Sequence, residues 1–338
     1  MQSKNFWHYV RVAEIKNFAE SIRSFVLQPE TGKPILYTAG SHLDLEVLIE
    51  GKIQTRSYSL IGLPNGKTYK IAVKHVRPSR GGSDYMFKLK KGARLKVSYP
   101  INNFEIYRHP SGQPSDQVVL VAGGIGITPI YTISQALGKS NVSCQLHYTA
   151  RSDNQFCLIN DLSELLGKNL CLYSGEKNKR IDLDNLLGGL PEKSVLYFCG
   201  PKPMLEQAQK VWKNQNRPVE NFRFETFGSS GQYATEPFEV KIPRLEKTLR
   251  VAENTSMLDA LISAGVEVIY DCKKGECGLC ALDILDVDGT IDHRDVFFSE
   301  NEKAENDRMC ACVSRISGKS VTIDTDDRSD NSSLNNHP

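Results

Sequence analysis

No apolar run in the 338-residue sequence approaches the roughly 20 residues that a membrane-spanning helix needs. The first ten residues also lack the apolar stretch of a secretory signal peptide. Neither sign of charge dominates, because 42 Lys plus Arg residues stand against 40 Asp plus Glu, a formal net charge of +2. That balance argues against a protein that binds nucleic acid through a basic surface. We therefore expect a cytoplasmic globular protein, without nucleic-acid or membrane partners, of two or three domains.

The order of the expected elements divides the chain into three domains. Residues 1–110 contain short strand-like runs between turn signals, a pattern typical of an antiparallel β-sandwich or β-barrel. Residues 111–228 alternate apolar strands with helices, as α/β domains with a parallel sheet do. A small, polar linker at 229–237 precedes an α+β domain at 238–327, and the polar residues 328–338 are expected to form a disordered tail.

Individual elements follow from hydrophobic periodicity and turn residues. The expected strands are 7–15, 22–29, 42–49, 55–62, 68–76, 93–100, 118–124, 143–150, 169–175, 194–200, a pair within 238–253, 281–289 and 319–325. The expected helices are 83–90, 129–138, 156–167, 203–215 and 256–265, the last with Ser256 as N-cap and Gly265 after its C-terminus.

Nine cysteines in a chain expected to be cytoplasmic need an explanation other than disulfides. Four are scattered through the middle, and five crowd the last fifth: Cys144, Cys157, Cys171 and Cys199, then Cys272, Cys277, Cys280, Cys310 and Cys312. The crowded set begins with C-x4-C-x2-C and continues about 30 residues later, which is the spacing of plant-type [2Fe–2S] ligands. Gly275 and Gly278 would let this loop wrap closely and aim backbone N–H groups at the sulfurs. A zinc site and a set of buried free thiols are the alternatives.

The segment DCKKGECGLC resembles the cluster loop of plant-type ferredoxins, and the resemblance extends over residues 238–325. It implies a β-grasp fold with Cys272, Cys277 and Cys280 as ligands. Two cysteines compete for the fourth position. Cys310 has the usual ferredoxin spacing, whereas Cys312 begins a CVSR segment that resembles the fourth-cysteine segment of phthalate dioxygenase reductase. We favour Cys312, and expect a hairpin at 285–289 to take up the extra length.

Glycines follow a buried strand and open a helix in the middle domain, where they would let a dinucleotide pyrophosphate approach the backbone. They are Gly123, Gly124 and Gly126. A second strand ends in Cys199, Gly200 and Pro201. The full G-x-G-x-x-G fingerprint is missing, and a tight strand-to-helix turn is the alternative. Together, AGGIGITP and CGPKPM resemble the NAD(P)H-binding half of the ferredoxin–NADP reductase superfamily.

That resemblance implies catalytic positions for Cys199 and Thr128, close to the nicotinamide and the flavin. Binding of the 2′-phosphate of NADPH would require Arg or Lys after a strand. The candidates, which are equally well read as solvated loop charges, are Arg151, Lys177, Lys179 and Arg180. We choose NADH because the family resemblance favours it.

RSYSL, at residues 56–60, lies ahead of these motifs in the order found in the same superfamily. The resemblance implies a segment, Ser57 included, that lines the flavin: Arg56 would support the phosphate, Tyr58 would pack on the isoalloxazine, and Ser59 would bond the ring near N5.

A second flavin-binding segment is the RGGS sequence ahead of an expected helix, a combination that makes an anion pocket. It comprises Arg80, Gly81, Gly82 and Ser83, and Lys74 of the preceding strand is expected to face the flavin. RGGS resembles the phosphate-binding segment of the phthalate dioxygenase reductase class, which uses FMN. We choose FMN over FAD because no segment suggests an adenine site.

The whole domain order resembles phthalate dioxygenase reductase and related reductase components of Rieske-type oxygenases. A flavin bridges two-electron NADH and a one-electron cluster. We therefore expect a monomer that passes electrons from NADH to FMN, to [2Fe–2S] and to the Rieske centre of a separate hydroxylase or demethylase of a small organic compound. The alternatives are an FAD-containing reductase of a diiron or other oxygenase, and a non-enzymatic redox sensor or electron-storage protein.

Overall fold

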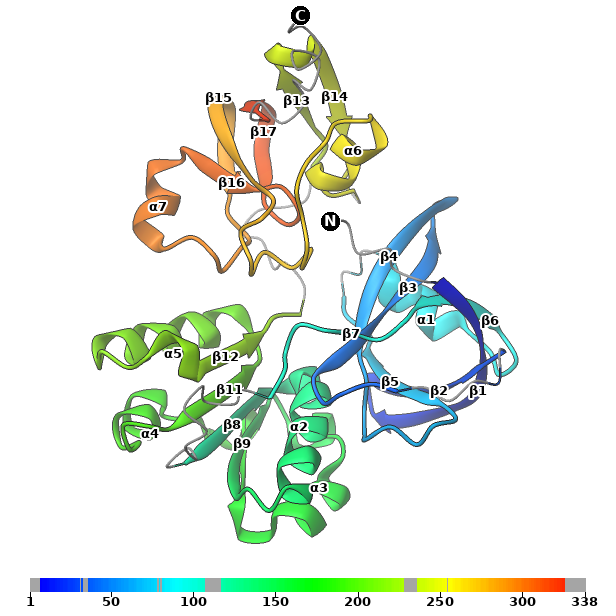
Figure 1. The fold of residues 1–338 in the computed structure, drawn as a ribbon, viewed down its shortest axis with the longest axis vertical. Helices are drawn as coiled ribbons and strands as arrows, with labels where there is room; N and C mark the ends of the chain where they lie inside the picture. The colour runs from blue at the N-terminus through cyan, green and yellow to red at the C-terminus, as the bar shows by residue number, and fades with distance from the viewer. Residues whose placement is uncertain are drawn as a thin grey trace, which may run out of the picture. The chain divides into compact units, whose positions relative to one another are not determined.

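The computed structural model describes residues 7–30, 32, 36–77, 79, 81–106, 117–227, 236–253 and 255–325 (Figure 1). The chain forms two compact units, Met1–Thr226 and Phe227–Pro338. Arg80, most of the expected linker and the expected tail lie outside the described residues. Within the described part, no helix combines the length and apolar character needed to cross a membrane.

The first sheet is an antiparallel barrel. Its path is β4–β3–β6–β1–β2–β5, and β7 pairs with β3. Leu60, directly after β4, forms a bridge to Ile71 of β5, so the two ends of the path meet and the sheet closes. The elements are β1 Trp7–Ala19, β2 Ile22–Pro29, β3 Ser41–Ile49, β4 Lys52–Ser59, β5 Tyr69–Lys74, α1 Gly82–Lys88, β6 Arg94–Ser98 and β7 Ile101–Asn102.

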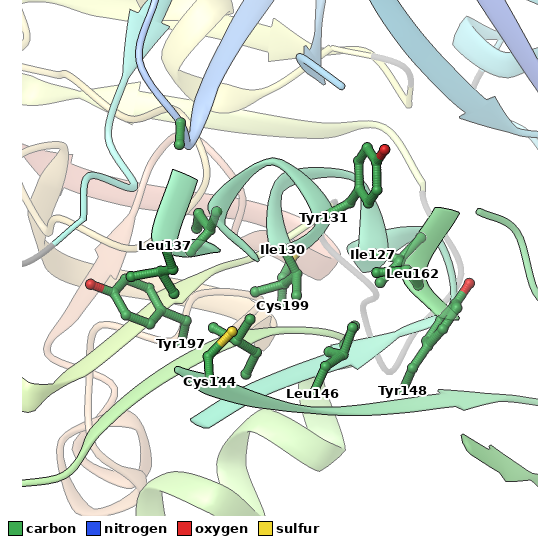
Figure 2. Packing of buried hydrophobic residues seen from close by; sticks show 14 of the residues in the cluster. Ile127, Ile130, Tyr131, Leu137, Cys144, Leu146, Tyr148, Leu162, Tyr197 and Cys199 are labelled. Atoms are coloured by element: carbon green, nitrogen blue, oxygen red, sulfur yellow. The ribbon is translucent and has the colours of Figure 1, made fainter. Parts of the chain in front are cut away.

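The second sheet is parallel, in the order β10–β9–β8–β11–β12. All six residues of the central strand β8 are buried, as a parallel strand covered on both faces requires. Side chains of α2 and of β9 face one another in the core beside it (Figure 2). The elements are β8 Val118–Gly123, α2 Ile127–Lys139, β9 Cys144–Ala150, α3 Ile159–Leu166, β10 Leu170–Ser174, α4 Leu183–Gly188, β11 Val195–Cys199, α5 Lys202–Asn214 and β12 Phe222–Glu225.

The second unit holds a mixed sheet in the order β14–β13–β17–β15–β16, in which only β13 and β17 are parallel. Its helix α6 begins as predicted, because the Ser256 side chain accepts from the Asp259 N–H. The elements are β13 Phe238–Ile242, β14 Lys247–Val251, α6 Met257–Ser263, β15 Ala281–Asp292, α7 Glu300–Glu305, β16 Arg308–Cys310 and β17 Arg315–Asp324.

The prediction of a hairpin at residues 285–289 is wrong. β15 continues through this segment and pairs with β17 from Asp283↔Asp324 to Asp292↔Arg315. Register shifts within this ladder absorb the irregularity instead of a chain reversal. The long ladder buries Ile316, Val321 and Ile323 of β17 and half-buries Ile284 and Val287 of β15.

Candidate functional site

Arg56 lies beside the first turn of α1. A Cβ added to Gly82 would come within 2.8 Å of the Arg56 Nε, so the side chain crosses this glycine closely. The Ser79 hydroxyl accepts from the Gly81 N–H at 3.0 Å and lies 3.0 Å from the Ser83 hydroxyl. A guanidinium, two hydroxyls and a helix start therefore meet at one place, a donor set that suits a phosphate.

The next residues of β4 face different surroundings. Tyr58 packs against the barrel core, and burial raises its pKa to about 12 although Arg56 acts in the opposite direction. The exposed Ser57 donates its hydroxyl to Asp44 at 2.6 Å. The flavin contacts of Arg56 and Tyr58 stay predictions, and the Ser57 hydroxyl is engaged with Asp44.

Ser59 meets a residue that the sequence did not suggest. Its hydroxyl lies 3.3 Å from Oε2 of Glu225, the last residue of β12, and both side chains are buried, at 4 % and 2 % exposure. Parallel pairing places Glu225 opposite Cys199 of β11. The carboxyl ends of two strands and the end of β4 therefore bring a hydroxyl, a carboxylate and a thiol into one buried region.

The two glycine-containing turns predicted for the nucleotide pack directly on each other. A Cβ at Gly126 would lie 2.1 Å from the Cys199 carbonyl oxygen, and one at Gly123 would lie 2.4 Å from Cδ of Pro201. Only glycine fits this contact, in which Gly200 also takes part. The structure thus brings the predicted turns together, and gives two of their glycines a packing role as well.

Gly124 is different, because its nearest neighbour would be the Lys74 ammonium at 3.8 Å. Lys74 donates to Gln155 at 3.2 Å, and burial, followed by the Arg151 charge, lowers its pKa. Thr128 is buried in the first turn of α2 and donates its hydroxyl to the Ile125 carbonyl at 3.0 Å. Gly124 and Lys74 therefore lie on the more open side of the turn, while the Thr128 hydroxyl points back into the helix.

Some of the cationic side chains that follow β9 and β10 contact neighbouring residues. Lys177 forms an ion pair with Asp153, which raises the Lys177 pKa. Glu176 accepts from the Asp153 N–H at 2.9 Å, and the Lys179 ammonium lies 5.4 Å from the Tyr173 ring centre. Of the four cationic candidates for a 2′-phosphate, two are therefore engaged with neighbours.

Five thiols gather in the second unit in two groups. Cys272 is hydrogen-bonded to Cys277, and burial raises its pKa to about 11. Hydrogen bonds from Cys310 and Cys312 to Cys280 lower the pKa of Cys280. Among the described residues, no three His, Cys, Asp or Glu side chains converge as ligands of one metal ion. A [2Fe–2S] cluster needs four thiolates, two on each iron, and the two groups contain that donor set.

The loop that carries the first three thiols depends on two left-handed glycines. Gly275 and Gly278 have φ of 75° and 72°, and a Cβ on them would lie 2.6 Å from Val313 and 2.2 Å from the Phe297 ring. The Lys274 N–H points at the Cys272 sulfur at 3.4 Å. The loop therefore wraps and directs a backbone donor as the sequence predicted.

Both candidates for the fourth position reach Cys280. Cys310 ends β16, opposite Ala281, and is fully buried. Cys312 follows in the next turn, is 9 % exposed, and its sulfur accepts from the Gly275 N–H. The hydrogen bond from the cluster loop is the contact that favours Cys312, which remains our prediction.

Three family models match consecutive parts of the chain. They are the oxidoreductase FAD-binding domain over residues 9–106, the oxidoreductase NAD-binding domain over 120–210, and the 2Fe-2S iron-sulfur cluster binding domain over 240–317. These matches confirm the predicted order of flavin, nucleotide and cluster domains.

Relatives align with this chain over nearly their whole length. The chain is 35 % identical over 320 residues to the heme-dependent oxidative N-demethylase beta subunit of Ectopseudomonas mendocina (strain ymp), covering 93 % of this chain and 98 % of that protein. It is 33 % identical over 323 residues to the toluene-4-sulfonate monooxygenase system reductase subunit of Comamonas testosteroni, with 93 % and 98 % covered.

Among solved structures, phthalate dioxygenase reductase, described as modular for electron transfer from pyridine nucleotides to [2Fe-2S], matches with a TM-score of 0.78 at 27 % identity. The match covers 94 % of this chain and 98 % of that one. Fold, domain order and full-length identity agree with one another, and the chain is therefore an oxidoreductase that belongs to the family of reductase subunits of oxygenase systems.

Proposed function

We propose that this chain oxidises NADH and passes the electrons through FMN and a [2Fe–2S] cluster to the Rieske centre of a separate oxygenase, acting as a monomer. The bound flavin would accept a hydride and release single electrons, and the cluster would carry them one at a time. The observation that carries the proposal is the match of one chain to a flavin-binding, an NAD-binding and a 2Fe-2S domain model in this order.

For the flavin, the residues at hand suit a single phosphate. Arg56, Ser79 and Ser83 surround the start of α1, and Gly82 leaves room for the guanidinium. Arg80, Tyr58 and Lys74 complete the proposed set. One compact anion pocket is what FMN needs, since FMN has one phosphate and FAD has two with an adenosine beyond them.

For the nicotinamide, we assign the buried region formed by Cys199, Ser59 and Glu225. This polar group would orient the ring against the flavin and keep water away, because each side chain is almost fully buried. The Lys177–Asp153 pair supports NADH, since a lysine already matched by a carboxylate attracts a 2′-phosphate less strongly.

For the cluster, we assign Cys272, Cys277, Cys280 and Cys312. Backbone N–H groups of Lys274 and Gly275 point at two of these sulfurs, and such hydrogen bonds stabilise thiolates.

Anaerobic purification with flavin and metal analysis tests this assignment. We expect one FMN, two irons and two acid-labile sulfides per chain, and rapid flavin reduction by NADH. Zinc without sulfide would refute the cluster, and released FAD would refute the FMN assignment.

An oxygenase component that uses heme in place of a Rieske centre is a second candidate partner. The relative with 35 % identity is named as the beta subunit of a heme-dependent N-demethylase. The test compares two electron acceptors with NADH in excess, a Rieske-type oxygenase component and a heme-dependent one. The acceptor that is reduced faster is the partner.

A further inference from the structure

Two buried carboxylates in the second unit are not explained by the functions above. They belong to the segment Asp292-His293-Arg294-Asp295, which follows β15. Asp292 forms an ion pair with Arg294 at 2.7 Å, so a neighbouring guanidinium compensates its charge. Asp295 has no exposed surface, and its two oxygens are held by the Ser314 hydroxyl and the Phe298 N–H, each at 3.0 Å.

Asp295 lies against the loop that carries the first three cysteines. A Cβ added to Gly275 would be 2.9 Å from the Asp295 Cα, and the Val296 N–H donates to the Gly275 carbonyl at 3.0 Å. Ser314, which holds the carboxylate, also donates its N–H to the Cys310 carbonyl at 3.0 Å. Asp295 therefore connects the two chain segments that supply the thiols.

The carboxylate is ionised under ordinary conditions. Burial by itself raises the pKa of Asp295, but the neighbouring His293 ring, hydrogen bonds from the Phe298 N–H and the Ser314 hydroxyl, and the Lys303 charge together bring the pKa below its usual value. The His293 ring nitrogen is 3.7 Å from the carboxylate, farther than the two hydrogen-bond donors.

A charge in this position would act on a cluster held by the loop. Reduction of a [2Fe–2S] cluster adds one negative charge, and the cluster potential depends on the net charge and hydrogen bonds around it. A buried carboxylate is poorly screened by solvent, so it opposes the added electron more than an exposed carboxylate does.

We propose that Asp295 is a positioning residue that holds a fixed negative charge against the cluster loop and thereby lowers the reduction potential of the cluster. The inference rests on the cluster assignment of the proposed function. Its consequence is a cluster that releases its electron to the partner oxygenase more readily.

The test is an anaerobic redox titration of the full-length, cluster-loaded protein, followed by EPR. For Asp295→Asn we expect the potential to rise by at least a tenfold change in the one-electron equilibrium, which corresponds to about 59 mV. Asp286→Asn, which removes an exposed carboxylate of β15, is the matched control and should shift the equilibrium less than twofold. Equal shifts in the two variants would overturn the proposal.

Ser314→Ala separates charge from mere loosening of the loop. It removes a hydrogen-bond donor and keeps the carboxylate, so the potential should not rise. A rise as large as that of Asp295→Asn would show that both changes act by opening the loop, and would overturn the proposal.

If the Asp295→Asn protein does not hold a cluster, the proposal is tested with Asp295→Glu and Ser314→Ala. Both variants retain the negative charge, so their cluster potentials should be no higher than that of the unmodified protein. Iron and sulfide analysis of the unmodified protein tests the cluster itself. A loaded cluster with an unmoved potential in Asp295→Asn refutes only the role of Asp295.

Discussion

The two glycine-dependent regions of this molecule are assembled in different ways. In the nucleotide domain, Gly123 and Gly126 pack on a turn that is about 75 residues away in sequence, and parallel pairing of β8 with β11 brings the turns together. In the second unit, most of the cluster loop is one continuous segment, Cys272–Cys280, whose shape is set by left-handed glycines. The first region therefore depends on the whole sheet, and the second on local backbone plus one remote turn.

The largest loss of function should follow from substituting a cysteine in the turn that completes the cluster region. Cys312→Ser should remove nearly all iron and sulfide while the flavin remains, because one iron loses a thiolate. Cys310→Ser is the matched variant, and its visible spectrum and iron content should stay close to those of the unmodified protein. The reverse outcome would show that Cys310 is the ligand, and retention of the cluster in both variants would point to exchange between the two thiols.

Gly126→Ala tests the turn-on-turn contact. The new methyl would meet the Cys199 carbonyl, so the turns must separate, and displacement of reacting groups by about 1 Å can cost about 100-fold in rate. We expect flavin reduction by NADH, followed by stopped-flow absorbance, to slow by about that factor while the cluster spectrum is kept. In Gly138→Ala the methyl meets only Leu165 at 3.5 Å, so no slowing is expected. Equal rates in the two variants would contradict the packing argument.

Truncation after Gly231 should show that the two regions work separately. The first unit should retain flavin and reduce ferricyanide with NADH, because its two sheets form one compact unit. Reduction of cytochrome c or of an oxygenase should fall by about tenfold or more, since these acceptors take electrons from the cluster. Undiminished transfer would mean that electrons leave from the flavin.

A smaller effect is expected at Thr132, which joins α2 to the loop after β4. Its buried hydroxyl donates to the Leu60 carbonyl at 2.8 Å and accepts from the Gly62 N–H at 2.9 Å. Thr132→Val leaves both backbone groups without this partner, so the free energy of unfolding should fall by about 2 kcal/mol. Thr132→Ser keeps the hydroxyl, and thermal unfolding of the two variants should differ by several degrees.

The parts that the sequence predicted are those governed by short-range patterns. The C-x4-C-x2-C spacing, the strands of the barrel and the Ser256 cap all depend on neighbouring residues. Glu225 escaped prediction because a single acid at the end of a short strand carries no local signal, and only its contact with Ser59 distinguishes it.

Long-range pairing accounts for the rest. The expected hairpin at 285–289 has turn-like residues, but the ladder of β15 with β17 overrides them. The helix α4 has six residues and β12 has four, too few for a clear periodicity. The packing role of Gly123 and Gly126 needs two turns that only the folded sheet brings together.

The contact of Ser59 with Glu225 also orders events during synthesis of the chain. Its two residues are 166 positions apart, so a ribosome finishes every strand of the barrel long before it makes the carboxylate. At the usual rate of about 5–20 residues per second, synthesis from the end of β7 at Asn102 to Glu225 takes roughly 6–25 seconds. The emerging barrel can close on its own strands during that time, but its Ser59 end is completed only when β12 has left the ribosome. Completion of the region proposed for the nicotinamide is thus tied to the last strand of the first unit, just before the second unit begins to emerge.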